Sequence, residues 1–101
     1  MAKLLPIEFH ADARIEADAS FDYYLQRNAR AAEAFYRELE NALRQIQVGR
    51  ERWPKYLYGT RRYLLKRFPF VIVYRLKESR IEIMAVAHGR RRPGYWSTRL
   101  A

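Results

Sequence analysis

The sequence predicts an α+β domain in which a helical hairpin packs on a small antiparallel sheet, with the element order β-α-α-β-β-β. Two observations support this prediction. Apolar residues of the first half recur with the 3.6-residue period of a helix, and from Arg61 onward the period changes to about two, as in strands. The 101 residues, half of them hydrophobic, fit a single domain spanning 1–101 with a modest core.

The first elements are a short strand and a helix. The stretch KLLPIEF, residues 3–9, has β-compatible apolar residues but contains Pro6, so an edge strand is expected. Asp12 is a plausible N-cap of the first helix, and Asn28 is expected to separate this helix from the next and to cap it. Residues at helical spacing in this segment are Ala13, Ala17, Phe21, Tyr24 and Asn28.

The second helix has a clearer apolar stripe and is expected to end at Gly49. The stretch RERWPKYLYGT, residues 50–60, is typical of an irregular loop. Its aromatic residues Trp53, Tyr56 and Tyr58 could form a binding surface, but the preferred interpretation is that they pin the loop onto the helices. The stripe of the helix consists of Ala32, Phe35, Leu39, Ala42, Leu43 and Ile46.

Three strands are predicted over residues 61–68, 70–76 and 80–88, joined by a turn at Phe68-Pro69 and a tight hairpin at 77–80. The middle strand is apolar on both faces. One face holds residues 70, 72, 74 and 76, and the other holds Val71 and Val73. A helical hairpin can cover only one of these faces, so the C-terminal segment or another protein should cover the second.

Charge is distributed unevenly along the chain. Residues 1–49 hold six basic and eight acidic side chains, whereas residues 50–101 hold fourteen basic and three acidic ones. The second half therefore carries a net charge of +11 within a chain of +9. Such asymmetry suggests a polyanionic or acidic partner, and the alternative is a basic surface that only aids solubility.

Several classes of site are excluded by composition. The chain has no cysteine, so disulfides and thiolate chemistry are absent, and its two histidines stand far apart in the sequence without a carboxylate pair beside either. No Gly-rich phosphate loop or nucleophile elbow is present. The apolar run Leu4 to Ile7 is too short for a signal peptide or a membrane span, so a cytoplasmic protein without a membrane partner is expected.

Four motifs follow one another between residues 61 and 96. They are an Arg-rich strand over 61–67, the turn Phe68-Pro69-Phe70, the strand end Tyr74-Arg75, and the set His88, Arg90, Arg91, Pro93 and Trp96. In this order they resemble the RelE/ParE superfamily of toxins from bacterial type II toxin–antitoxin modules, and the ParE-like members in particular. The resemblance spans nearly the whole chain, and the ordered set of motifs is its most specific part.

The resemblance implies one of two activities. RelE-like members are ribosome-dependent mRNA endonucleases, whereas ParE-like members poison DNA gyrase, which requires recognition without bond-making by the toxin. Metal-free RNA cleavage needs a base, a cation for the phosphorane and an acid. The nucleases tend to keep a basic residue early in the third strand, where this chain has only the apolar residues 70–73. A ParE-like gyrase poison is therefore favoured, with the mRNA endonuclease second and a non-toxic nucleic-acid-binding or interaction module third.

The partners implied by the resemblance are a cognate antitoxin, ParD-like or similar, and DNA gyrase as the target. Operator DNA would be contacted only indirectly, through the antitoxin, and no cofactor is implied. A neighbouring small reading frame encoding an acidic-tailed antitoxin would support this interpretation. The antitoxin is expected to supply acidic and apolar side chains together.

The resemblance also indicates candidate residues for the functional site. His88 could be the base of a nuclease. The preferred interpretation is that one ring nitrogen of His88 bonds to backbone and fixes the turn at Gly89. Trp96 is expected to pack in the core. For a nuclease the candidates are Lys66, Arg67, His88, Arg90 and Tyr95. For binding of the target they are Arg62, Lys66, Arg67, Arg90, Arg91 and Arg92. The run at 90–92 could be a solvated strand end or a phosphate clamp flanked by the stacking aromatics Tyr95 and Trp96, and a functional role is preferred for at least two of these arginines.

Overall fold

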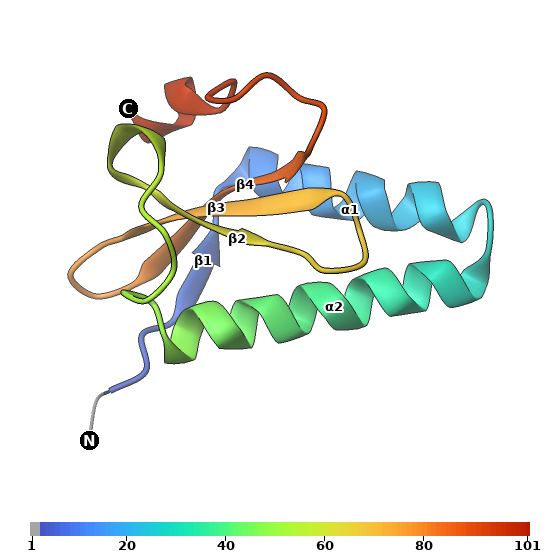
Figure 1. The fold of residues 1–101 in the computed structure, drawn as a ribbon, viewed down its shortest axis with the longest axis horizontal. Helices are drawn as coiled ribbons and strands as arrows, with labels where there is room; N and C mark the ends of the chain where they lie inside the picture. Colours follow the sequence, from blue (N-terminus) through green and yellow to red (C-terminus); the bar gives the residue numbers. More distant parts are fainter. Residues whose placement is uncertain (1–2) are drawn as a thin grey trace.

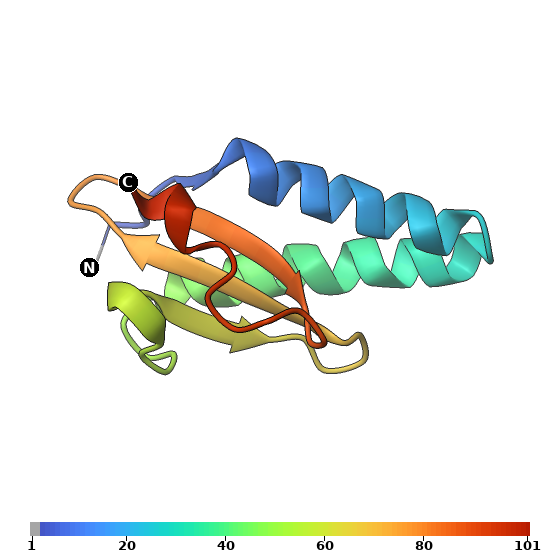
Figure 2. The same ribbon diagram turned by 90° about the horizontal axis from the view of Figure 1, so that it is seen from above.

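The structure, a computed structural model, describes residues 3–101 and confirms the predicted order of elements. Helices α1 and α2 form an antiparallel hairpin against one face of a four-stranded sheet, and the C-terminal segment lies across the other face (Figures 1 and 2). No helix within residues 3–101 is long and apolar enough to cross a membrane. The elements are β1 (Ile7–Phe9), α1 (Ala11–Leu25), α2 (Ala29–Val48), β2 (Arg61–Leu64), β3 (Phe70–Leu76) and β4 (Ile81–His88), with short 3-10 turns η1 (Leu57–Gly59) and η2 (Ser97–Leu100).

The sheet is mixed, which corrects the prediction of a wholly antiparallel one. Its strand order is β1-β4-β3-β2, with β2, β3 and β4 antiparallel and β1 parallel to β4. Two reversals, from β2 to β3 and from β3 to β4, make β4 run in the same direction as β2. The helical hairpin returns the chain so that β2 runs in the direction of β1, and β1 therefore meets β4 in parallel. β1 is an edge strand, as predicted.

The helix ends follow local capping chemistry. Asn28 caps α2 as predicted, because its side-chain oxygen accepts hydrogen bonds from the amides of Arg30 and Ala31, and Gly49 is the C-cap. The N-cap of α1 is His10, not Asp12: Nδ1 of His10 accepts the Asp12 amide at 3.0 Å. The predicted cap therefore lies inside the first turn, where its charge favours the helix N-terminus.

Strand β2 ends at Leu64, four residues before the predicted end at Phe68. The backbone amides of Lys66 and Arg67 both donate to the carboxylate of Glu38 on α2. This helix side chain takes the two amides out of the sheet ladder, and the chain turns early toward β3. A contact between distant segments thus decides where the strand stops.

The core has two layers, one on each face of the sheet. The helix side contains the predicted stripe of α2 apart from Ala32, which is buried outside this cluster, and the alternate residues of β3. The other side contains Val73, Met84, Ala85, Ala87 and Trp96. Consecutive residues of a strand normally point to opposite faces, but Met84 and Ala85 lie on the same side, because the pairing of β4 with β3 is irregular opposite Val73 and Tyr74. Trp96 is 1% exposed, so the C-terminal segment covers the second apolar face, one of the two coverings predicted.

Aromatic residues of the 50–60 loop divide between the two layers. Trp53 donates its ring N–H to the Gln45 carbonyl of α2 and stacks edge-on against Tyr63, as expected for a residue that pins the loop to the helices. Tyr56 and Tyr58 instead lie 6.0 and 6.1 Å from the ring centroid of Trp96. Their predicted contact with the helices is wrong, because the C-terminal segment offers apolar surface nearer to them.

Candidate functional site

A cavity lies between the C-terminal segment and the sheet. It has a volume of about 200 Å³, and its floor is made by Val71, Val73 and Ala87. β2 contributes Arg62 to its wall, and the loop before β2 contributes Tyr56. The opposite wall comes from the chain after β4, namely His88, Gly89, Arg91, Arg92, Pro93, Tyr95 and Trp96.

The chain after β4 is held by a series of local hydrogen bonds. Nδ1 of His88 accepts the Arg90 amide at 3.1 Å, and the His88 carbonyl accepts the Arg91 amide at 3.0 Å. The Gly89 amide donates to the Pro69 carbonyl at 2.7 Å, which ties this turn to the turn between β2 and β3. His88 thus bonds to backbone, as preferred from the sequence, and Gly94 has a φ of 83° that suits glycine.

Two arginines of the cavity stack on aromatic rings. The guanidinium carbon of Arg62 lies 4.7 Å from the ring centroid of Tyr56, and that of Arg91 lies 3.8 Å from the ring centroid of Tyr95. Nε of Arg62 is buried and has no hydrogen-bond partner among residues 3–101. No aspartate or glutamate lines the cavity, so its walls carry positive charge only.

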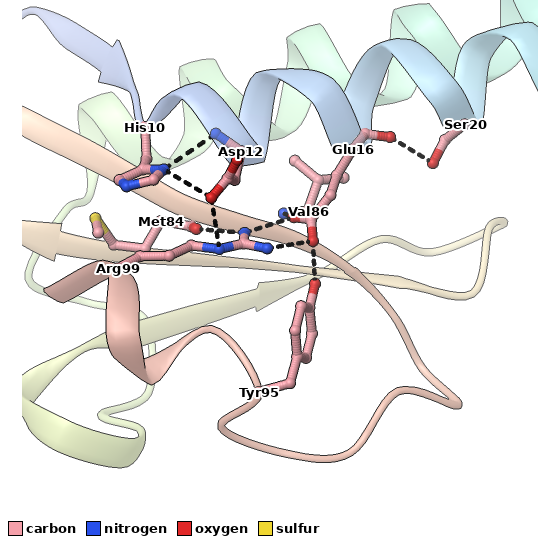
Figure 3. A network of polar contacts seen from close by, with 8 residues as sticks. All are labelled: His10, Asp12, Glu16, Ser20, Met84, Val86, Tyr95 and Arg99. Atoms are coloured by element: carbon pink, nitrogen blue, oxygen red, sulfur yellow. Dashed lines mark hydrogen bonds and ion pairs between the residues drawn. The ribbon is translucent and has the colours of Figure 1, made fainter.

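Beside this cavity, a polar network joins α1, β4 and the C-terminal segment (Figure 3). Arg99 donates from Nη2 to Glu16 Oε2 at 2.8 Å and from Nη1 to Glu16 Oε1 at 2.9 Å. The Tyr95 hydroxyl donates to Glu16 Oε2 at 2.5 Å. Glu16 and Arg99 side chains are 16% and 13% exposed, so the pair is well shielded from water.

The network also completes the hydrogen bonding of β4. Strand β1 pairs with β4 only as far as Ile83, and beyond that point no strand within residues 3–101 lies beside this edge of β4. There the Val86 amide donates to Glu16 Oε1 at 3.0 Å, and the Met84 carbonyl accepts from Arg99 at 3.0 Å. The two side chains replace the missing strand and prevent the costly burial of free backbone groups.

The network shifts the pKa values of Glu16, Tyr95 and Arg99. Burial opposes ionisation of Glu16, but hydrogen bonds from Arg99, Tyr95 and the Val86 amide outweigh it and hold the pKa of Glu16 below its usual value. Burial, then the hydrogen bond to Glu16, raises the pKa of Tyr95 well above that of a free phenol. The hydrogen bond to Glu16 raises the pKa of Arg99. At neutral pH the pair is therefore ionised and Tyr95 is a neutral donor.

The structure brings some of the predicted site residues together and separates others. The target-binding candidates Arg62, Arg91 and Arg92 line the cavity with His88 and Tyr95. Lys66 and Arg67 instead lie at the turn after β2, where Glu38 binds both amides, and Arg67 also forms an ion pair with Glu38 at 3.4 Å. Arg90 is exposed and does not line the cavity.

Sequence reasoning did not single out Glu16, Arg99 or Glu38. Each is a charged residue next to apolar neighbours, as Glu16 is beside the buried Ala17. Such a position indicates that a charged side chain lies near the core, but it does not identify the residue with which that side chain pairs. The partners come from elements far apart in the chain, 83 residues for Glu16 and Arg99.

The chemistry available in the cavity is that of anion binding. Guanidinium groups donate in a fixed fork that matches carboxylate and phosphate oxygens. The hydroxyl of Tyr95 already donates to Glu16, and Nδ1 of His88 already accepts from Arg90. Within residues 3–101, no three His, Asp or Glu side chains lie close enough together to hold a metal ion.

A family model for the ParE toxin of the type II toxin–antitoxin system parDE matches residues 7–93. The chain belongs to this ParE toxin family. The matched segment includes Glu16, Arg62 and the three arginines at 90–92. The ParE match ends before Tyr95, Trp96 and Arg99, so the residues that close the cavity and complete the network lie beyond it.

The ParE fold is also found in a solved structure. A chain of the chromosomal ParDE toxin–antitoxin system from P. aeruginosa is similar with a TM-score of 0.72 and 21% sequence identity, and the match covers 84% of this chain and 96% of that one. At this level of identity the likeness concerns the fold. No curated protein sequence significantly matches this chain.

Proposed function

We propose that this ParE-family toxin inhibits DNA gyrase by binding to it, without catalysing bond cleavage, and that a cognate antitoxin neutralises it. The observation that carries the proposal is the family match over residues 7–93. The geometry agrees with a binding function, because the hydroxyl of Tyr95 already donates to Glu16, and one ring nitrogen of His88, Nδ1, already accepts from the Arg90 amide.

The surface offered to gyrase in this proposal is the basic end of the sheet. Arg90, Arg91 and Arg92 are all exposed, and they follow β4 at a turn that Pro69 and Gly89 hold in place. Since the hydrogen bonds of this turn involve backbone and His88, the arginine side chains are available to a partner. Their positive charge would also speed encounter with an acidic surface.

The antitoxin requires an apolar surface as well as a charged one. Because the C-terminal segment covers the second face of the sheet, we place the apolar contact in a groove of about 480 Å³ at the end of α1. Tyr23, which is 51% exposed, lies on its rim with Arg27 stacked 3.6 Å from the ring centroid. The groove is lined by Ala19, Ser20, Tyr23, Tyr24, Pro69, Phe70 and His88.

The experiment that tests the target has two arms. In the first, the purified protein is added to DNA gyrase and the supercoiling of a relaxed plasmid is measured; inhibition that rises with toxin concentration is expected. In the second, the protein is added to a translating ribosome extract and the messages are mapped for cleavage; intact messages are expected. Cleavage within translated frames, with gyrase unaffected, would assign the chain to the endonucleases instead.

The neutralisation step is tested with the antitoxin encoded beside this gene. Adding it in equal amount should restore gyrase activity. The replacement Tyr23→Asp should weaken the complex, because it puts a negative charge and a shorter side chain on the apolar groove. Val48→Asp, at an exposed position of α2 remote from the groove, is the matched control and should leave binding unchanged. Equal weakening by both variants would show that the antitoxin docks elsewhere.

A further inference from the structure

The cavity beneath the C-terminal segment contains a buried hydrogen-bond donor that no group within residues 3–101 satisfies. Nε of Arg62 is buried without a partner among residues 3–101. Buried polar groups in folded proteins are nearly always hydrogen-bonded, so a donor left in this state points to a ligand. The cavity that Arg62 lines is also lined by Arg91, Arg92 and His88 and by no carboxylate.

Within the described part of the chain, the three arginines of the cavity wall have no carboxylate partner. Exposed arginines such as Arg44 also have none, so the set is distinguished by its place in the cavity and by the buried Nε of Arg62, whereas several other arginines are paired. Arg67, Arg75, Arg80 and Arg99 each form an ion pair with a glutamate. Within residues 3–101, the guanidinium groups of Arg62, Arg91 and Arg92 form neither an ion pair nor an intramolecular hydrogen bond that would occupy their donors. Stacking on Tyr56 and Tyr95 orders two of them in advance, which reduces the entropy that a ligand must overcome.

We propose that this cavity binds a phosphate group. Arg62 approaches from β2, while Arg91 and Arg92 approach from the chain after β4, so an anion between them must accept hydrogen bonds from opposite walls. The tetrahedral oxygens of phosphate point in several directions and can do so, whereas a carboxylate has two oxygens in one plane. The apolar floor of Val71, Val73 and Ala87 excludes water and strengthens the attraction.

The phosphate could come from free inorganic phosphate or from a nucleotide, since both present the same oxygens to the arginines. For a nucleotide, the half-buried ring of Tyr56 in the cavity wall provides surface for a base. The inference does not rest on inhibition of gyrase, because a phosphate site is compatible with either target. Arg91 and Arg92 also belong to the surface proposed to bind gyrase, so phosphate binding is measured directly on the purified chain, and failure of one proposal does not decide the other.

The test uses the full chain with inorganic phosphate as the probe, at constant ionic strength set with chloride. Two-dimensional ¹H–¹⁵N NMR follows the side-chain Nε–H signals of the arginines together with the backbone amides. Saturable shifts are expected at Arg62 Nε–H and at the amides of Gly89 and Arg91. Calorimetry under the same conditions gives the affinity, and acetate serves as the planar anion for comparison.

The variants separate the cavity from the general basic surface. Arg62→Met keeps an apolar stem against Tyr56 but removes the donors, and phosphate binding should weaken about ten-fold or more. Arg92→Ala, at an exposed position, should also weaken binding and provides a second variant if Arg62→Met fails to fold. Arg44→Ala, exposed on α2, removes the same charge away from the cavity and should leave the affinity unchanged.

The outcomes distinguish a specific phosphate site in the cavity from general attraction of anions to the basic surface. Shifts spread over the whole basic surface, an equal effect of Arg44→Ala, or acetate binding as tightly as phosphate would each overturn the proposal. Adenosine 5′-monophosphate then distinguishes the sources. Tighter binding than phosphate, with a change in tryptophan fluorescence, would identify a nucleotide as the ligand, and equal binding would identify the phosphate group alone.

Discussion

Glu16 on α1 and Arg99 in the last turn of the chain form a two-pronged ion pair, with nitrogen–oxygen distances of 2.8 and 2.9 Å, across the unpaired edge of β4. The pair takes over the hydrogen bonds of the Val86 amide and the Met84 carbonyl where β1 stops. It also fixes Tyr95, which forms part of the cavity wall. The C-terminal segment is thereby attached to the helical layer through the sheet edge.

Replacing Glu16 by Gln should lower the free energy of unfolding by about 1–3 kcal/mol. The amide still accepts the Val86 N–H, but the partly buried Arg99 keeps only the more exposed carboxylate of Asp12, 3.9 Å away, as a counter-charge. Urea denaturation measures the change. The control is Glu33→Gln, whose pair with Arg37 at 3.3 Å is exposed and should contribute no more than about 0.5 kcal/mol. Similar losses for the two variants would contradict a stabilising role of the network.

Lowering the pH should destabilise the protein through protonation of the Glu16 carboxylate. The pKa of Glu16 in the folded state is below its usual value of 4.5, so the unfolded chain binds the proton first as the pH falls. The stability from Glu16 is fully present above pH 4.5 and is lost as the pH drops through the lowered pKa. Denaturation measured from about pH 6 to about pH 3 should show this decrease, and Glu16→Gln should show a shallower one. Identical pH profiles would exclude Glu16 as a contributor.

Truncating Trp96 should cost far more than truncating an exposed apolar residue. Trp96 is 1% exposed and covers the second face of the sheet, where it packs in one cluster with Met84 of β4, so Trp96→Ala should lower stability by about 3–5 kcal/mol. Val48→Ala, 72% exposed on α2, is the control and should stay within about 0.5 kcal/mol. Thermal melting of both variants provides the comparison. A wild-type melting temperature for Trp96→Ala would show that the sheet face does not need its cover.

The arginines after β4 should behave in the opposite way. Replacing Arg90 and Arg91 together by Ala removes two exposed side chains, so stability should change by no more than about 1 kcal/mol. Growth inhibition on expression should nevertheless be lost, because these side chains form part of the surface proposed to bind the target. Melting and growth are measured side by side, with Arg37→Ala plus Arg44→Ala on α2 as a charge-matched control. Full toxicity of the Arg90/Arg91 variant would make this segment structural only.

The element order and most boundaries could be predicted because they depend on local signals. The stripe of α2, the cap at Asn28 and the alternation of β3 are each set by residues a few positions apart, and their periods identify the element. The same alternation on β3 predicted that two faces need covering. The packing of Trp96 could also be foreseen, since a large aromatic side chain near the chain end is most stable when buried.

What only the tertiary structure decided is the partnership of charges from distant segments. Glu38 ends β2 early, β1 joins β4 in parallel, and Glu16 meets Arg99 where β1 stops. Each outcome depends on two elements that the fold brings together, and charged residues have no period that identifies a partner. Arg62 and Arg91 are both visible in the sequence as basic residues, but the cavity they share exists only once the C-terminal segment folds back over the sheet.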